Sequence, residues 1–423
     1  MKSNRCLFIV ILILLAIIIV FASLLEHRES KLASGGPSLT EAKEVYEEKA
    51  SEGEADHELQ ADPGEVLAVE ERILEPSFPV ALVYDKYLTT YTYFFVGEDS
   101  VIIRQGPSFS EPILRKAEYG ERLDYLETVY VAADDGGTEQ WHHIIWEEDG
   151  QKRFGFIHGS DATERLYQFD KMEEAVKKAE AYAERGELTY ISNYQNQNGY
   201  APLYKGKTVD DKGNRRSQSA PGYSSLSHEE DFIYLGDGTL VRYLFPSEDY
   251  VRVEVVASGE RYYVPRKYIP KDHRIHDLRK IIVVDVTNQN EGVYEKIEGT
   301  WTLISYTQAT TGKEGRYSQP TPTGFYFGIE RRPYFRYYED GTTKIQGYAP
   351  YAIRFAGGAY IHGVPVNYKY LADGTQITPP HQEYSKTIGT VPLSHKCVRN
   401  YTSHAKFLYD WFSPGETVVI VID

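Results

Sequence analysis

The chain has 423 residues, a length that suggests two to four domains, and its 41% hydrophobic and 13% aromatic residues are enough for globular cores. Its 62 acidic residues outnumber its 46 basic residues. The resulting net charge of −16 argues against nucleic acid as a partner, because nucleic acid requires a basic face.

The N-terminus predicts a membrane anchor over residues 1–25. Residues 7–25 are nineteen apolar or small residues without a charge, close to the roughly 20 that a helix needs to cross a bilayer. Lys2 and Arg5 precede this segment and two glutamates follow it, so the positive-inside rule places the remainder of the chain outside the cell membrane. An uncleaved single-pass anchor is favoured over a cleaved signal peptide, because the apolar segment is longer than a signal core.

This orientation separates the two cysteines. Cys6 falls in the cytoplasmic tail, where it is either an acylation site or inert. Cys397 becomes the only thiol outside, without a partner in its own chain. An intermolecular disulfide, a reactive thiol and an ordinary buried cysteine therefore stay open for Cys397.

Acidic residues with few aromatics predict a solvated stalk over 26–78. Residues 79–160 then form short alternating runs between Gly, Pro and Asp turns, which predict a small β domain. The runs RQGPS, YGERL and GFI resemble bacterial SH3-like domains over 97–160. In that family the domain binds cell-wall peptide or spaces a catalytic domain.

Apolar residues at intervals of three to four predict a connecting helix within 161–189. A second β-rich module follows at 190–270, with GDGT (236–239) as a tight turn and a possible SH3-like fold. Residues 271–423 predict a third, mostly β domain. It has a helix at 403–412 after the cysteine and closes with an apolar strand. The predicted fold class is mostly β and multidomain.

Cys397 has the surroundings that a nucleophilic thiol requires. A thiolate is activated by a histidine or by backbone amides at a helix start, and the predicted helix follows Cys397 closely. His362 (YIHGV) and His381 (PPHQEY) are candidate general bases, and His395 is the nearest histidine in sequence. Backbone amides at Lys396 and Cys397 could form an oxyanion hole. These residues indicate acyl transfer through a thioester.

The motifs IHG (361–363) and SHKCVR (394–399), with TPTG before a strand, make residues 277–423 resemble the L,D-transpeptidase catalytic domain of the YkuD type. The resemblance implies a β-sandwich-like fold, a peptidoglycan stem-peptide substrate and no cofactor or metal. It also implies attack of a cysteine on the third stem residue, release of D-alanine, and formation of a 3→3 cross-link.

The resemblance carries roles to individual positions. Cys397 matches the nucleophile, His362 the general base, and His395 the second histidine, which shapes the loop. Ser394 matches the Ser/Thr before it, Arg399 matches a basic position that could hold a substrate carboxylate, and Gly363 lets the backbone pass close to the site.

Three positions depart from the family pattern. Lys396 stands where glycine is usual, and His404 where an aspartate is frequent near the helix start. His362 lies 35 residues before Cys397, roughly double the usual spacing, because residues 367–386 resemble an insertion that could form a lid. His381, 16 residues before the cysteine, is therefore the rival base. His362 is favoured because the His-Gly context belongs to it.

The sequence thus predicts a membrane-anchored, extracytoplasmic L,D-transpeptidase that binds peptidoglycan stem peptides. An L,D-carboxypeptidase using the same site and a non-catalytic wall-binding protein remain alternatives. His273 and His276 are two histidines without a third ligand and do not predict a metal site. The sequence predicts no oligomeric state.

Overall fold

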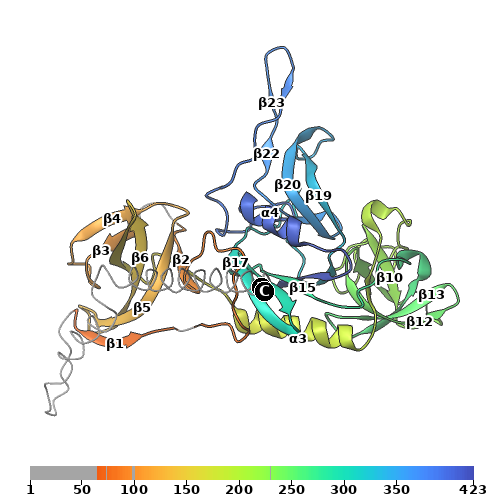
Figure 1. The fold of residues 1–423 in the computed structure, drawn as a ribbon, viewed down its shortest axis with the longest axis horizontal. Coiled ribbons are helices and arrows are strands. Elements are labelled where there is room, and N and C mark those ends of the chain that lie inside the picture. Colours follow the sequence, from red (N-terminus) through yellow and green to blue (C-terminus); the bar gives the residue numbers. More distant parts are fainter. Residues whose placement is uncertain (1–63, 73, 98–100, 229) are drawn as a thin grey trace, which may run out of the picture. The chain divides into compact units, whose positions relative to one another are not determined.

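The computed structural model describes residues 64–423 except 73, 98–100 and 229. The described part is mostly β, as predicted (Figure 1). The predicted anchor and most of the predicted stalk lie outside the described residues. Among the described residues, no helix is long and apolar enough to cross a membrane.

An N-terminal sheet of eight strands has the order β4-β3-β7-β6-β5-β2-β8, with β1 paired to β5. This pairing path is open in the described residues rather than closed into a barrel. β1 and β8 join the sheet from outside the predicted 79–160 segment. The strands are β1 (Val66–Glu70), β2 (Thr92–Phe95), β3 (Val101–Arg104), β4 (Ile113–Ala117), β5 (Arg122–Ala132), β6 (Thr138–Glu148), β7 (Gln151–His158) and β8 (Thr163–Leu166).

Helix α3 (Phe169–Glu184) lies within the predicted 161–189 segment and leads into a middle sheet ordered β11-β10-β14-β13-β12-β9. Its elements are β9 (Leu188–Tyr190), η1 (Tyr194–Asn196), β10 (Ser219–Tyr223), β11 (Phe232–Gly236), β12 (Leu240–Ser247), β13 (Tyr250–Val255), β14 (Arg261–Pro265) and η2 (Arg266–Tyr268). We refer to residues 190–270 as the middle module.

The C-terminal domain contains two five-stranded sheets. Sheet I has the order β17-β16-β15-β26-β18 and comprises β15 (Lys280–Asp285), β16 (Asn290–Ile297), β17 (Thr300–Gln308), β18 (Gly324–Phe327) and β26 (Thr417–Ile422). Sheet II has the order β19-β20-β21-β25, with β22 on β20, and comprises β19 (Glu330–Tyr338), β20 (Ile345–Ala356), β21 (Ala359–His362), β22 (Val366–Asn367) and β25 (Val398–Arg399).

The alternation along β15 explains how the layers form. Ile282 and Val284 belong to a core cluster that also contains Ile361 and Val398 of sheet II, so the two sheets pack as a sandwich. Ile281 and Val283 point to the other face, where they belong to a cluster with residues of α3. The four central residues of the strand, 281–284, are therefore all apolar because both faces of sheet I are covered.

Two further elements flank the sandwich. Helix α4 (Thr402–Trp411) follows β25, and its Leu408 belongs to the sandwich core. Within the predicted insertion, β23 (Lys369–Tyr370) and β24 (Gln376–Ile377) form a hairpin that extends beyond the β19–β20 pair (Figure 1).

Candidate functional site

Strands β21 and β25 bring the predicted nucleophile and base to one face of sheet II. The two strands run parallel, with Ile361 beside Val398 and His362 beside Arg399. Ile361 and Val398 point into the sandwich core. Because successive side chains alternate, His362 and Arg399 point to the opposite face, and so does Cys397, which forms a cluster with Tyr360 and Ala352. Cys397 directly precedes β25, so Cys397 and His362 lie on the same face of sheet II.

The thiol of Cys397 is buried, with 7% of the residue exposed. Its Sγ lies 3.9 Å from the Gly358 carbonyl oxygen, in the turn between β20 and β21. Burial raises the pKa of the thiol, while the backbone N–H of Tyr360 and the charges of Arg399 and Lys396 lower it. Burial is the largest of these effects, so the resting cysteine is a neutral thiol.

The imidazole of His362 is also buried, and its tautomer follows from one contact. Nδ1 lies 2.6 Å from the carbonyl oxygen of Gly363. A carbonyl can only accept, so Nδ1 carries the proton and Nε2 keeps the lone pair that a general base needs. Gly363 lets the backbone pass close to the start of α4, because a Cβ there would come within 2.7 Å of the Thr402 Oγ1 atom.

Burial, together with the nearby charge of Arg399, lowers the pKa of His362 to about 3, although the hydrogen bond to the Gly363 carbonyl acts in the opposite direction. The resting pair is therefore a thiol and a neutral imidazole. Such a pair reacts by general-base catalysis, in which the proton moves from Sγ to Nε2 as the sulfur attacks.

Stability should fall on acidification, because two imidazoles are buried in the neutral form. Burial also lowers the pKa of His142, to about 4. The unfolded chain binds these protons near pH 6.5 and the folded chain does not, so stability is full above pH 6.5 and is lost toward pH 4. Each histidine contributes a slope of at most about 1.4 kcal/mol per pH unit. In denaturant titrations from pH 7 to 4, His142→Gln should lose less stability than the wild type; equal losses would contradict this account.

Two side-chain hydroxyl groups help to hold the loop 394–397. The Ser394 hydroxyl donates to the Cys397 carbonyl. The Thr321 hydroxyl donates to the Lys396 carbonyl, 3.0 Å away, and accepts from the Gly312 N–H at 2.8 Å. Outside the strand ladders, no described backbone hydrogen bond uses the N–H of Lys396 or Cys397 as donor. Both amides are therefore available as the predicted oxyanion donors.

Lys396 has a φ of +92°, a conformation that favours glycine. Lys396, at the position where the resemblance leads one to expect glycine, therefore carries backbone strain. Gly312 passes so close that a Cβ on it would come within 2.7 Å of the Lys396 backbone. In the sequence, only the SHKCVR motif (394–399) points to this strain.

Replacing Lys396 with glycine should stabilise the fold, because relief of the strain outweighs the added freedom of the unfolded chain. We expect a gain of about 1 kcal/mol in the free energy of unfolding. Denaturant unfolding of the wild type, Lys396→Gly and Lys396→Met measures this gain. Lys396→Met removes the charge but keeps the strain, and a gain of the same size in that variant would show that strain is not the cause.

The other predicted residues lie around this face. The Arg399 Nε is buried without a hydrogen-bond partner among the described atoms, and the Arg399 charge acts on Cys397 and Tyr337. His395 is exposed and forms an ion pair with Asp340 at 2.9 Å. His395 therefore points away from the thiol's buried surroundings, and its side chain makes no described contact with Cys397.

The rival base His381 is exposed in the insertion, where its ring contacts Tyr348 and Tyr351. It does not lie on β21 or β25. The predicted helix after the cysteine is α4, which begins at Thr402, and β25 lies between it and Cys397. His404 is fully buried in an ion pair with Glu291 at 3.1 Å, and His276 faces Glu187.

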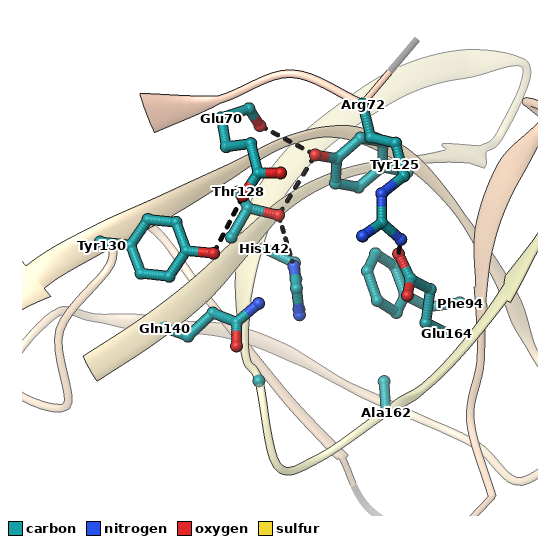
Figure 2. Close-up of a pocket in the computed structure, with 11 residues that line it drawn as sticks. Glu70, Arg72, Phe94, Tyr125, Thr128, Tyr130, Gln140, His142, Ala162 and Glu164 are labelled. Carbon is teal, nitrogen blue, oxygen red and sulfur yellow. Dashed lines mark hydrogen bonds and ion pairs between the residues drawn. The ribbon is translucent and has the colours of Figure 1, made fainter. Parts of the chain in front are cut away.

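A separate cavity of about 230 Å³ lies in the N-terminal sheet (Figure 2). The Tyr125 hydroxyl donates to the Glu70 carbonyl oxygen and lies 3.2 Å from the Thr128 hydroxyl, which contacts His142 Nδ1 at 3.1 Å. Arg72 pairs with Glu164 at its rim. The polar groups of this cavity largely satisfy one another and include no cysteine, so the thiol chemistry belongs to sheet II.

Sequence reasoning missed the residues that complete the site from a distance. Thr321 fixes the cysteine loop, and Phe335 of β19 packs its ring against His362, with centroids 5.1 Å apart. Asp237 of the middle module binds the β20–β21 turn through the Gly357 N–H at 3.1 Å. The TPTG motif was the only signal for Thr321. No sequence signal connects Asp237 to the turn.

Comparison with known proteins supports the assignment of the C-terminal domain. Residues 279–421 match the family described as the L,D-transpeptidase catalytic domain, YkuD. No curated protein matches the chain.

Three solved structures that align with the chain have low TM-scores. A fused Zn-dependent amidase/peptidase/peptidoglycan-binding protein of Clostridium acetobutylicum is 20% identical, covers 36% of this chain and 55% of its own, and has a TM-score of 0.24. An L,D-transpeptidase of Mycobacterium smegmatis is 16% identical (46% and 70% covered, TM-score 0.26). L,D-transpeptidase 3 of Mycobacterium tuberculosis is 16% identical (44% and 79% covered, TM-score 0.27). The chain thus spans about half the length of the first of these.

Proposed function

We propose that this protein is a peptidoglycan L,D-transpeptidase that acts through a thioester on Cys397 and forms 3→3 cross-links. The match of residues 279–421 to the catalytic domain supports the transpeptidase class. The observation that carries the assignment of residues is the placement of Cys397 and His362 on one face of β21 and β25, with the His362 tautomer set by the Gly363 carbonyl.

The reaction follows from this geometry. Nε2 of His362 takes the thiol proton while Sγ attacks the carbonyl carbon of the third stem residue, and the oxyanion accepts from the amides of Lys396 and Cys397. The C–N bond to D-alanine breaks, and the imidazolium returns its proton to the leaving amine. The side-chain amine of an acceptor stem then attacks the thioester, passes a proton to His362, and displaces the sulfur, which regains the proton.

Arg399 supplies charge on the same face. Its guanidinium has no carboxylate partner among the described residues, and it is the strand neighbour of His362. An arginine in this position can hold a substrate carboxylate by two parallel hydrogen bonds. We assign Arg399 to orienting the donor peptide rather than to proton transfer.

The remaining parts of the proposal concern placement in the cell. The apolar segment 7–25 supports a single-pass anchor with the catalytic domain at the cell wall. The SH3-like identity of the N-terminal module and its binding to the cell wall stay predictions. A module bound to the wall would hold the enzyme near its substrate.

The products of the full chain with tetrapeptide muropeptides test the proposal. Mass spectrometry should detect cross-linked dimers together with released D-alanine, both absent with Cys397→Ala. Tripeptide without dimers would replace the transpeptidase by an L,D-carboxypeptidase of the same mechanism. Absence of any product would favour the wall-binding alternative.

A further inference from the structure

A recess of about 310 Å³ next to the cysteine loop is lined from two domains. The middle module contributes Arg215 and Gln218. The catalytic domain contributes Arg316, Gly358, His395 and Lys396. Gly358 is the residue whose carbonyl oxygen lies next to Cys397 Sγ, so the recess adjoins the reacting atoms.

The recess is basic. None of its lining residues is an aspartate or glutamate. Arg215, Arg316 and Lys396 form no ion pair among the described residues, whereas His395 is occupied by Asp340. Lys396 is half-buried, and both burial and the positive charge of Arg215 lower the pKa of its ammonium. The nearby Cys397 and Asp237 raise the pKa of Lys396, and the Asp237 carboxylate is bound to Arg354. Like charges that face each other in a recess are stabilised by an anion between them.

The middle module is fixed against the catalytic domain at this point. Asp237, in its GDGT turn, forms a buried ion pair with Arg354 of β20 at 2.7 Å and accepts from the Gly357 N–H. The neighbouring Gly238 has a φ of +88°, and a Cβ on it would lie 1.8 Å from the Phe355 carbonyl oxygen. Only glycine allows this approach, so the turn docks directly on the strand end that carries Gly358.

A second contact joins the module to the face that carries the thiol. The Tyr194 hydroxyl of η1 lies 3.3 Å from that of Tyr360, the residue whose backbone N–H lies near Cys397. The guanidinium of Arg354 lies over the Tyr194 ring at 4.3 Å. The module is therefore a wall of the active site rather than a spacer.

We infer that Arg215 of the middle module, together with Lys396 and Arg316, binds a free carboxylate of the peptide substrate and makes the enzyme select carboxylate-ending stems. This inference rests on the proposed function, because it takes the substrate to be a peptide that reacts at Cys397. The bound carboxylate can come from two sources. One is the C-terminal carboxylate of the donor, which belongs to the residue that is released, and the other is a carboxylate of the acceptor.

Binding to the full-length Cys397→Ala chain tests the inference without requiring turnover. The probes are a donor tetrapeptide and an acceptor tripeptide, each as the free acid and as the C-terminal amide, titrated by calorimetry. Because Arg215→Gln removes one charge-assisted contact, the variant should bind the free acid about tenfold more weakly than the parent chain does. Its affinity for the matching amide should not change. Arg316→Gln should act in the same direction. Arg252→Gln, an arginine of the same module that does not line the recess, is the matched control.

The probe that responds identifies the source. If Arg215→Gln weakens binding of the tetrapeptide acid alone, the carboxylate belongs to the donor. If it weakens binding of the tripeptide acid alone, the carboxylate belongs to the acceptor. Equal binding of acid and amide, no binding of either acid, or equal effects of Arg215→Gln and Arg252→Gln would overturn the inference. If binding depended on Arg215 but the wild type formed no product, the proposed enzymatic function would be contradicted and the carboxylate site would still be supported.

Discussion

Replacing Cys397 with alanine should abolish acyl transfer, lowering the rate by roughly 10⁴-fold or more. Cys397 is the only cysteine that the structure describes, and its sulfur lies on the face that carries His362. No other described side chain on this face can form a thioester. Product formation from tetrapeptide, measured with the wild type and Cys397→Ala side by side, checks the effect.

The fold should survive this change. Removing one buried sulfur leaves a small cavity, which costs about 1 kcal/mol of unfolding free energy. Cys397→Ser is the matched control, because it keeps the size of the side chain and replaces the thiol by a poor nucleophile. Retained turnover in Cys397→Ala would remove the thioester mechanism.

Replacing His362 with alanine should lower kcat by about 10²–10⁴-fold, because the neutral thiol then lacks a base to receive its proton. His362 is suited to this role because the Gly363 carbonyl holds the proton on Nδ1 and frees Nε2. Single-turnover acylation of the variant, followed over pH, would separate the loss of the base from a loss of binding.

His381→Ala is the control for this prediction. His381 is exposed and contacts two tyrosine rings in the insertion, so its loss should change kcat by less than threefold or so. If His381→Ala were the more damaging variant, the assignment of the base to His362 would be wrong.

Local patterns in the sequence predict much of the C-terminal domain. The unbroken apolar run of β15 indicates a strand that is covered on both faces, and the apolar stripe within 161–189 indicates the helix that covers one of them. Periodic patterns of this kind succeed because they are short-range properties of the chain. The motifs around His362 and Cys397 predict that these two residues form the catalytic pair, and this role stays a prediction.

The contribution of the middle module could not be predicted in this way. The GDGT motif indicates a tight turn, but the partner of Asp237 is Arg354, 117 residues further on. A long-range ion pair leaves no periodic trace in the sequence. For the same reason the sequence shows a lysine at 396 without showing that it lines one recess with Arg215. The predicted helix 403–412 agrees with α4 within one residue, whereas the short strand β25 has no distinctive pattern.

The most direct test of the central claim is the intact mass of the full-length protein after brief incubation with a donor tetrapeptide and no acceptor. The account predicts an adduct equal to the tetrapeptide minus D-alanine, mapped by proteolysis to the segment that contains Cys397 and absent in Cys397→Ala. An unmodified wild-type protein, or an adduct at another residue, would contradict it.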